Sequence, residues 1–393
     1  MKAKRVVVLH AVPSREPRAP IGLDESPAGG VVLSILDEAS PGLEELRERP
    51  GYRIEAPSFD VQLIAPMSVS QADASASPPE LSWGVEAVGA LDSPFDGAGV
   101  VVAILDTGID REHPAFSGIE VVEEDFTGEG NGDSNGHGTH CAGTICGRDV
   151  NGTRIGVARG VKKLLIGKVL GSSGGGSTDG IADAMQWALK NGAHIISMSL
   201  GMDFPGYQRE LARRGVPQEV ATSMALEGYR ENIRLFDSIA ALISAGEFLG
   251  RRALVVAAAG NESRRDVSSG FTIAKAPPAA AEGFLSIGAV ELANDSERRF
   301  KIARFSNTKV DLAAPGVGIW SAKPGGGLHA LSGTSMAAPH VAGVAALWAQ
   351  KSISENDGDV IIGDVLESLR WSAEMSPGLK REDVGKGVVK APV

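Results

Sequence analysis

The stretch LSGTSMAAPHVAGVAALW, residues 331–348, begins with small polar residues and continues with many Ala, Gly and Val residues. We expect a turn followed by a buried helix that begins near Ser335. Backbone N–H groups and the helix dipole favour negative charge at a helix N-terminus, so a serine there is well placed to attack a carbonyl and stabilise the resulting oxyanion. A purely structural interpretation is also open, because small residues let two backbones approach closely. The choice requires a base, an orienting acid and an oxyanion donor elsewhere in the chain.

Short, continuous apolar runs precede this stretch, and each is bounded by Gly, Asp, Asn or Ser. They lie at residues 100–105, 162–170, 194–200, 253–259 and 284–290. Helical patterns such as TDGIADAMQWALKNG lie between several of them. Buried runs that alternate with helices are typical of a parallel sheet covered on both faces. We therefore predict one α/β domain over residues 81–393, with its ligand site beyond the carboxyl ends of the strands.

Polar side chains lie where these predicted elements end or begin. Asp106 and Asn261 each follow a buried run, His137 begins a predicted helix, and Ser335 begins the helix quoted above. Taken singly, each has a structural explanation, since Asp and Asn often end strands and a lone His is more often structural. Four such residues at one edge of one predicted sheet indicate a shared site.

These four side chains have the chemistry that serine catalysis requires. Serine is a poor nucleophile until a base takes its proton, so His137 has to reach Ser335. A carboxylate at Asp106 can hold the imidazole in the right tautomer and stabilise its cation. The tetrahedral oxyanion needs preorganised donors, which the Asn261 carboxamide and the Ser335 N–H can supply.

The motifs AILDTGID, HGTHCAG, AAAGN and GTSMAAPHVAG resemble the Asp, His, oxyanion and Ser motifs of the subtilisin-like (subtilase) serine protease family, in that family's order. The resemblance covers residues 81–393. It implies a subtilisin-like, mainly parallel sheet with helices on both faces. It also implies an endopeptidase that works through an acyl-enzyme, with Asp106, His137 and Ser335 as the triad and Asn261 in the oxyanion hole.

The resemblance also implies that a substrate peptide binds as an added strand. The implied substrate-binding residues are Ser199, Leu200 and Gly201 on one side, Gly171 and Ser172 within a stretch reaching Gly174 on the other, and Ala258, Ala259 and Gly260 in the pocket before the scissile bond. Ordinary turn chemistry is the alternative explanation for these glycines.

Residues 1–66 are predicted to form a small α+β domain. RVVVL, GVVLSIL and FDVQLIAP are typical of strands, and SPGLEELRERPG predicts a helix with Ser40 as N-cap and Pro41 at its first position. The polar residues 67–80 predict a linker. More loosely, LEELRERPGYRIE resembles a subtilase propeptide, which would fill the cleft with its C-terminal end. We expect this domain to be cut off within 67–80 or to stay attached as a regulator.

The chemistry is expected to need no cofactor. Ala115 stands where many family members have a calcium-ligating Asp, although the later segment keeps the oxygen-bearing residues Asp149, Asn151 and Thr153. We therefore expect no tight calcium site of the usual kind and assign no metal ligands. Weaker calcium binding elsewhere stays open.

Charge and cysteine content narrow the classes further. The net charge is −11 with no run of Lys or Arg, which argues against nucleic acid and anionic membranes as partners. Cys141 and Cys146 lie five apart in one predicted helix, so we expect core packing rather than a disulfide. The first residues contain no apolar run long enough for a signal peptide. We expect a cytoplasmic protein, or a secreted one if a leader precedes the printed sequence.

Alternative functions stay open at this point. The chain could be a peptide-binding or partner-binding protein held inactive by its N-terminal domain, or an enzyme that cleaves or transfers one particular precursor peptide. The insertion at residues 202–252 predicts extra helix, which would serve as a lid, a docking element or decoration. An α/β-hydrolase is excluded, because the serine lies in GTSMA and not in a G-x-S-x-G elbow, and because the chain order is Asp, His, Ser.

Overall fold

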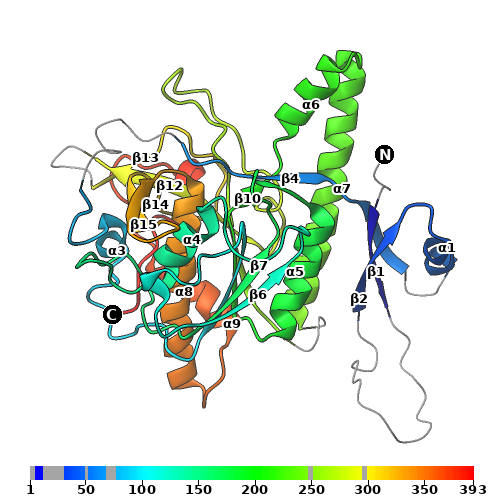
Figure 1. Ribbon diagram of the computed structural model, residues 1–393. Helices are drawn as coiled ribbons and strands as arrows, with labels where there is room; N and C mark the ends of the chain where they lie inside the picture. Colours follow the sequence, from blue (N-terminus) through cyan, green and yellow to red (C-terminus); the bar gives the residue numbers. More distant parts are fainter. Residues whose placement is uncertain (1–4, 12–30, 49–51, 68–76, 247–250, 294–298) are drawn as a thin grey trace, which may run out of the picture.

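The computed structural model describes residues 5–11, 31–48, 52–67, 77–246, 251–293 and 299–393. Figure 1 shows a large unit built around a twisted sheet and a small N-terminal unit at its side. The chain crosses from the small unit into the large one through a single extended segment.

The central sheet has the strand order β13-β12-β11-β9-β5-β7-β6, with β14 beside β12. Every neighbouring pair is parallel except β12 and β13. The strands are β5 (Val101–Asp106), β6 (Glu120–Asp125), β7 (Lys163–Lys168), β9 (Ile195–Met198), β11 (Leu254–Ala258), β12 (Leu285–Leu292), β13 (Phe300–Ile302) and β14 (Leu312–Pro315). The predicted α/β class with a mainly parallel sheet is confirmed. The apolar runs did not predict β6, because it is an edge strand that carries acidic side chains.

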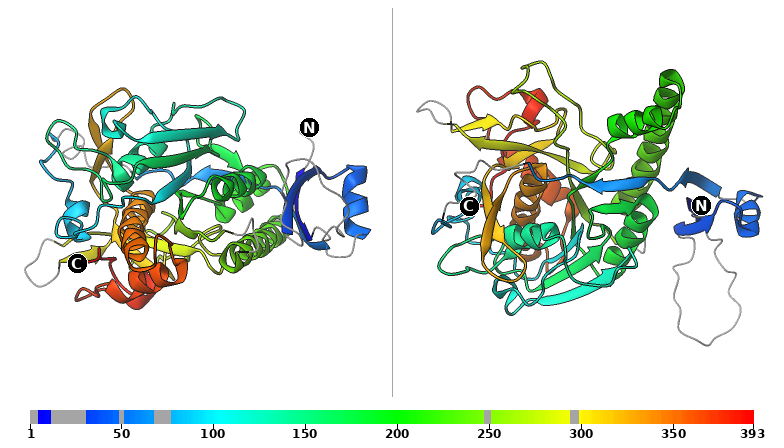
Figure 2. Two further views of the ribbon diagram at one scale, coloured as in Figure 1. Left: turned by 90° about the horizontal axis from the view of Figure 1, so that it is seen from below. Right: turned by 45° about the horizontal axis from the view of Figure 1, so that its top comes forward.

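Alternate residues of β5 face opposite sides of the sheet. Val102 and Ile104 join a core with α4 (His137–Cys146) and α8 (Thr334–Glu355). Ala103 and Leu105 join a second core with α5 (Thr178–Lys190) and α7 (Gln218–Ala245). Both faces are therefore covered, as the two views of Figure 2 also show. This burial on both faces explains why the central strands are continuous apolar runs.

The small unit has a three-stranded antiparallel sheet in the order β2-β1-β3, covered on one face by one helix. Its elements are β1 (Arg5–Ala11), β2 (Val31–Asp37), α1 (Pro41–Glu48) and β3 (Tyr52–Pro57). Val6 and Val8 of β1 pack on α1, whereas Val7 and Leu9 join the core that contains α5 and α7. The small unit thus shares a hydrophobic core with the large one.

The segment FDVQLIAP does not complete the small sheet, contrary to the prediction that residues 1–66 form one unit. Its strand β4 (Asp60–Leu63) lies between β8 (Gly175–Ser177) and β10 (Leu200–Gly201) of the large unit and is antiparallel to both. The backbone N–H and C=O groups of an extended segment need hydrogen-bond partners. This segment finds them in β8 and β10, which belong to the large unit. Most of the predicted linker, residues 68–76, lies outside the described residues.

The insertion forms a helical hairpin that projects from the body of the molecule (Figure 1). It consists of α6 (Phe204–Arg213), in which no residue is buried, and the long α7. The remaining elements are α3 (Trp83–Ala87), a 3₁₀ turn η1 (Pro114–Phe116), β15 (Ile319–Ala322), β16 (Leu328–Leu331), α9 (Ile362–Ser372) and α10 (Arg381–Val384). Within the described ranges, no helix has the length and apolar character that crossing a membrane requires.

Candidate active site

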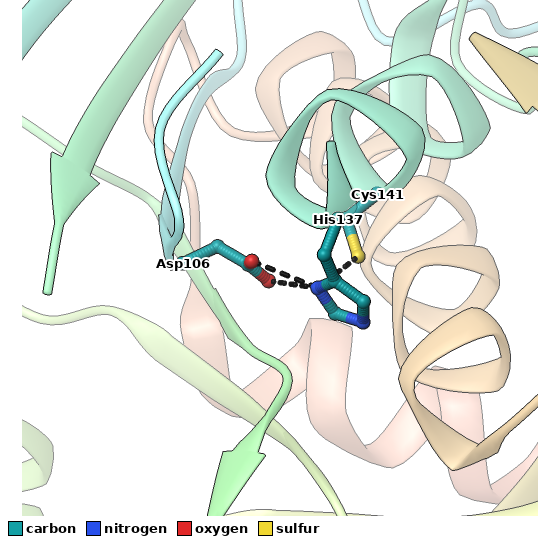
Figure 3. Close-up of side chains that lie close together, drawn as sticks. All are labelled: Asp106, His137 and Cys141. Carbon is teal, nitrogen blue, oxygen red and sulfur yellow. Dashed lines mark hydrogen bonds and ion pairs between the residues drawn. The ribbon is translucent and has the colours of Figure 1, made fainter. Parts of the chain in front are cut away.

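Asp106 is the last residue of β5, and His137 is the first residue of α4, directly after Gly136 in a left-handed conformation at φ 98°. Nδ1 of His137 lies 2.8 and 3.0 Å from the two carboxylate oxygens of Asp106. Both side chains are 1% exposed. Figure 3 shows the carboxylate directed at the imidazole. The structure therefore brings together the predicted acid and base.

The pKa of His137 reflects two opposing effects. Burial favours the neutral imidazole, while the charge of Asp106 and the hydrogen bond to it favour the cation. The second effect prevails, and the pKa of His137 lies well above its usual value of 6.5. A protonated His137 cannot accept a proton, so its imidazole can serve as a base only at a pH above this raised pKa.

Ser335 is the second residue of α8, and Pro339 lies four residues further along the same helix. Proline has no N–H, so the carbonyl of Ser335 loses its normal helical partner. The structure supplies other donors: the Ser199 hydroxyl at 3.2 Å and the Cys141 thiol at 3.5 Å. Pro339 thus frees a carbonyl whose two side-chain contacts hold the start of the helix in place.

The hydroxyl of Ser335 does not bond to His137. It donates instead to the carbonyl of Ile64 at 3.1 Å. Nε2 of His137 has no hydrogen-bond partner among the residues that the structure describes. The carbonyl of Ile64, in the segment that follows β4, thus accepts the hydrogen bond of the Ser335 hydroxyl, and Nε2 of His137 receives none from it.

The carboxamide of Asn261 points at the same segment, with Nδ2 donating to the carbonyl of Ala65 at 3.1 Å. Its Oδ1 accepts from the N–H of Thr334 at 2.9 Å and from the Thr334 hydroxyl at 3.0 Å. Two donors on the oxygen fix which end of the amide faces Ala65. Sequence reasoning did not single out Thr334, although its position directly before Ser335 is a signal that could have identified it.

The segment between the two units passes through the site in an extended conformation. Leu63 pairs with Leu200, and Gln62 pairs with Gly201 and with Gly175. Beyond Ala65, the N–H of Met67 donates to the carbonyl of Ser332 at 2.7 Å. Ala65 and Pro66 therefore lie beside Asn261 and Ser335 with backbone hydrogen bonds on both sides.

The predicted substrate-binding residues differ in their contacts. Leu200 and Gly201 pair with β4, while the side chain of Ser199 turns to Ser335. Gly171 and Ser172 do not pair with β4, because residues 171–175 form a turn closed by the N–H of Gly171 and the carbonyl of Gly175. On that side the partners of β4 are β8 and the carbonyl of Gly174, the last residue of the predicted stretch.

Ala258 and Ala259 are buried, and the chain turns at Gly260, whose φ of 111° favours glycine. The N–H of Gly260 donates to the Thr334 hydroxyl at 3.1 Å. These three residues therefore form the connection that brings Asn261 to the site.

Cys141 lies one helical turn beyond His137, with its sulfur 3.7 Å from Nδ1 (Figure 3). The prediction of mere core packing missed this contact, which the i, i+4 spacing in α4 would have indicated. Asp106, His137 and Cys141 place their donor atoms within 4.8 Å of one another. Burial raises the pKa of the Cys141 thiol, which disfavours the thiolate that metals prefer. Both cysteines are free, as expected.

The oxygen-bearing residues considered for calcium have other partners. Ala115 is buried. The Asp149 carboxylate accepts two hydrogen bonds from Arg159, at 2.9 and 3.0 Å. The Thr153 hydroxyl donates to the carbonyl of Pro79 at 2.6 Å. A cation at this loop would have to compete with a guanidinium.

Comparison with known proteins gives a consistent result. The family described as the subtilase family matches residues 97–366. The chain is 38% identical to alkaline elastase YaB from a Bacillus species, over 69% of this chain and 61% of the elastase. It is 34% identical to M-protease from Shouchella clausii, over 79% of this chain and 72% of that protein. It is 36% identical to subtilisin Savinase from Lederbergia lenta, over 69% of this chain and 85% of that protein.

The expectation of a cytoplasmic protein is wrong. The matching relatives are secreted, extracellular subtilisins and alkaline proteases. The short apolar run at the start of the printed sequence was a weak basis for that expectation, because it speaks only for the residues printed.

Proposed function

The chain belongs to the subtilase family of serine endopeptidases, and from this premise we propose that it hydrolyses peptide bonds through an acyl-enzyme on Ser335. One observation carries the assignment of the site. Nδ2 of Asn261 binds the carbonyl of Ala65, while the hydroxyl of Ser335 binds the neighbouring carbonyl of Ile64. An extended peptide therefore lies across the groups that the chemistry needs.

In the proposed reaction, the hydroxyl oxygen of Ser335 attacks the carbonyl carbon, and Nε2 of His137 takes the hydroxyl proton. Asp106 holds the other ring nitrogen and stabilises the imidazolium. The oxyanion accepts hydrogen bonds from Asn261 and from the N–H of Ser335. His137 then gives its proton to the leaving nitrogen, and water, activated in the same way, releases the acyl group. No cofactor takes part in this chemistry.

We propose that the N-terminal unit regulates the enzyme by keeping residues 60–67 in the cleft. The unit is attached by apolar contacts and by the ion pair between Arg5 and Asp179 at 2.8 Å. The carbonyl at Asn261 belongs to Ala65, so self-cleavage would follow Ala65 and not fall within residues 67–80 as the sequence suggested. A peptide substrate can bind only after this segment has left.

Pro66 follows the carbonyl that Asn261 binds, so its ring nitrogen would be the leaving group. The ring replaces the amide hydrogen and restricts the backbone. We expect Pro66→Ala to increase the rate of self-cleavage after Ala65 by about tenfold, which corresponds to about 1.4 kcal/mol in activation free energy. Intact mass followed over time measures the rate. The double variant with Ser335→Ala is the control and should stay whole, and equal rates for wild type and Pro66→Ala would contradict the prediction.

Asn261→Ala removes one proposed donor to the oxyanion. We expect kcat to fall by about 10²–10³, the range established for subtilisin itself, with little change in KM. A tetrapeptide p-nitroanilide assay measures both parameters. Asn191→Ala is a matched control, because this exposed amide bonds to the carbonyl of Trp187 at the end of α5. An unchanged kcat for Asn261→Ala would remove this residue from the oxyanion hole.

We propose further that the loop at Asp149 does not form the tight calcium site of many subtilases. Two observations support this proposal: Asp149 is paired with Arg159, and Ala115 is buried. Ca²⁺ needs six to eight oxygen ligands, and this loop commits its carboxylate to a guanidinium.

A further inference from the structure

We propose that the α6–α7 hairpin forms a binding site for an aromatic side chain of the bound peptide. The site would accept the residue six positions before the one whose carbonyl binds Asn261. In the resting chain that residue is Phe59, counted back from Ala65. This inference rests on the proposed function in one respect, since it assigns the site to substrates as well as to the N-terminal segment.

Phe59 extends the strand pairing of β4 by one residue. The N–H of Thr178 donates to the carbonyl of Phe59 at 2.9 Å, and the N–H of Phe59 donates to the Thr178 hydroxyl at 3.2 Å. The next pair along the ladder is Asp60 with Ser177. Phe59 is therefore held in register with the residues that lie at the nucleophile, and any extended peptide in the cleft would place a side chain here.

The ring of Phe59 packs against the helical hairpin. Its centroid lies 6.0 Å from the Tyr207 ring in an edge arrangement and 6.4 Å from the Phe204 ring. Phe204 in turn contacts Tyr229 of α7 at 5.3 Å, again edge to face. Aromatic pairs in these arrangements stabilise each other beyond the apolar area that they bury. Two rings of the insertion thus pack against the ring of the bound segment, and a third ring packs against one of them.

Gly228 of α7 lies directly beneath this ring. A Cβ atom at position 228 would lie 2.5 Å from Cζ of Phe59 and 2.7 Å from Cε1. Glycine destabilises a helix interior relative to alanine. The glycine therefore weakens α7 at the point where it lets an aromatic ring approach the helix.

The hairpin is also fixed to Thr178, the first residue of α5, whose backbone pairs with Phe59. Asn232, which is fully buried, accepts a hydrogen bond from the Thr178 hydroxyl at 3.1 Å and donates to the carbonyl of Gly228 at 2.9 Å. One side chain thus links the backbone partner of Phe59 to the floor of the site. A cavity of about 430 Å³ lies beside Phe59, and Tyr207 and Met224 also line it.

The first experiment compares two peptides in one reaction with the full chain. They are acetyl-Phe-Asp-Val-Gln-Leu-Ile-Ala-p-nitroanilide and the same peptide with Ala in first place. Because both compete for the same free sites, the ratio of their rates at low concentration does not depend on how much enzyme the N-terminal segment blocks. We expect the Phe peptide to be preferred about tenfold or more in wild type, from the apolar area buried. Gly228→Ala, which fills the site and favours helix, should bring the ratio close to one.

Leu226→Ala is the matched control, because this α7 side chain is 64% exposed and lies outside the site. It should keep the wild-type ratio. The tetrapeptide Gln-Leu-Ile-Ala-p-nitroanilide reports activity that does not need the hairpin. If this tetrapeptide is hydrolysed but the enzyme shows no preference between the two longer peptides, the inference is overturned and the proposed function stands.

A second experiment needs no catalysis. In the Ser335→Ala background, hydrogen exchange at residues 59–63 reports how firmly the segment is held. Phe59→Ala and Gly228→Ala should each speed this exchange about tenfold or more, and Leu226→Ala should not. Unchanged exchange in both variants would overturn the inference. If wild type hydrolyses none of the three peptides, the proposed function fails, while this measurement still decides whether the hairpin binds Phe59.

Discussion

Ser335→Ala is expected to abolish peptide hydrolysis, with kcat falling by about 10⁶, the size of effect established for the nucleophile of subtilisin. The variant keeps the site otherwise intact, since the N–H of residue 335 and Asn261 remain. Only the oxygen that would form the acyl-enzyme is lost. The rate of tetrapeptide p-nitroanilide hydrolysis measures the effect, and labelling by a fluorophosphonate probe should disappear in parallel.

The control for this variant is its fold. Ser335 donates a hydrogen bond to the carbonyl of Ile64, so its loss should loosen residues 60–67 slightly without unfolding the large unit. Thermal unfolding and hydrogen exchange in the central strands check this. Retained hydrolysis in a pure preparation would exclude Ser335 as the nucleophile. A wild-type chain that neither hydrolyses peptides nor reacts with the probe would favour a peptide-binding protein.

Asp106→Asn is expected to lower kcat by about 10⁴, as in the corresponding substitution of another serine protease triad. An amide at this position is nearly the same size as the carboxylate but can donate a hydrogen bond to Nδ1. Nε2 would then carry the proton and could not act as the base. Steady-state kinetics with the tetrapeptide measures the loss.

The same substitution should change the pH profile. In wild type the pKa of His137 is raised well above 6.5, so the neutral base, and with it activity, is lost as the pH falls through that raised value. Without the negative charge of Asp106 the pKa of His137 falls, and the acidic limb of kcat/KM should move to lower pH. Asp149→Asn is the matched control, because its carboxylate is exposed and pairs with Arg159. An unmoved limb in Asp106→Asn would mean that another group controls the profile.

Local pattern predicted most of the large unit. The five apolar runs became β5, β7, β9, β11 and β12, because strands buried on both faces have to be apolar throughout. The motifs also identified residues that meet at the ends of the strands. Among them are Asp106 and His137, whose Oδ1 and Nδ1 atoms lie 2.8 Å apart. Asp106 ends a strand and His137 begins a helix, so topology brings them together once the sheet has formed. The contacts of Thr334 and Cys141 were not predicted, although their sequence spacing from Ser335 and His137 offered a signal for both.

The sequence by itself therefore determined the class of fold, five of the central strands and the set of candidate catalytic residues, since each follows from short-range patterns of burial and from motifs. Only the tertiary structure decided where the residues after Pro57 pair. The segment FDVQLIAP has the pattern of a strand in either unit, and its partners in β8 and β10 lie more than a hundred residues away. The contact of Phe59 with the hairpin has the same origin. The local sequence indicates that such a segment forms a strand, but long-range contacts determine its partner strands and its register.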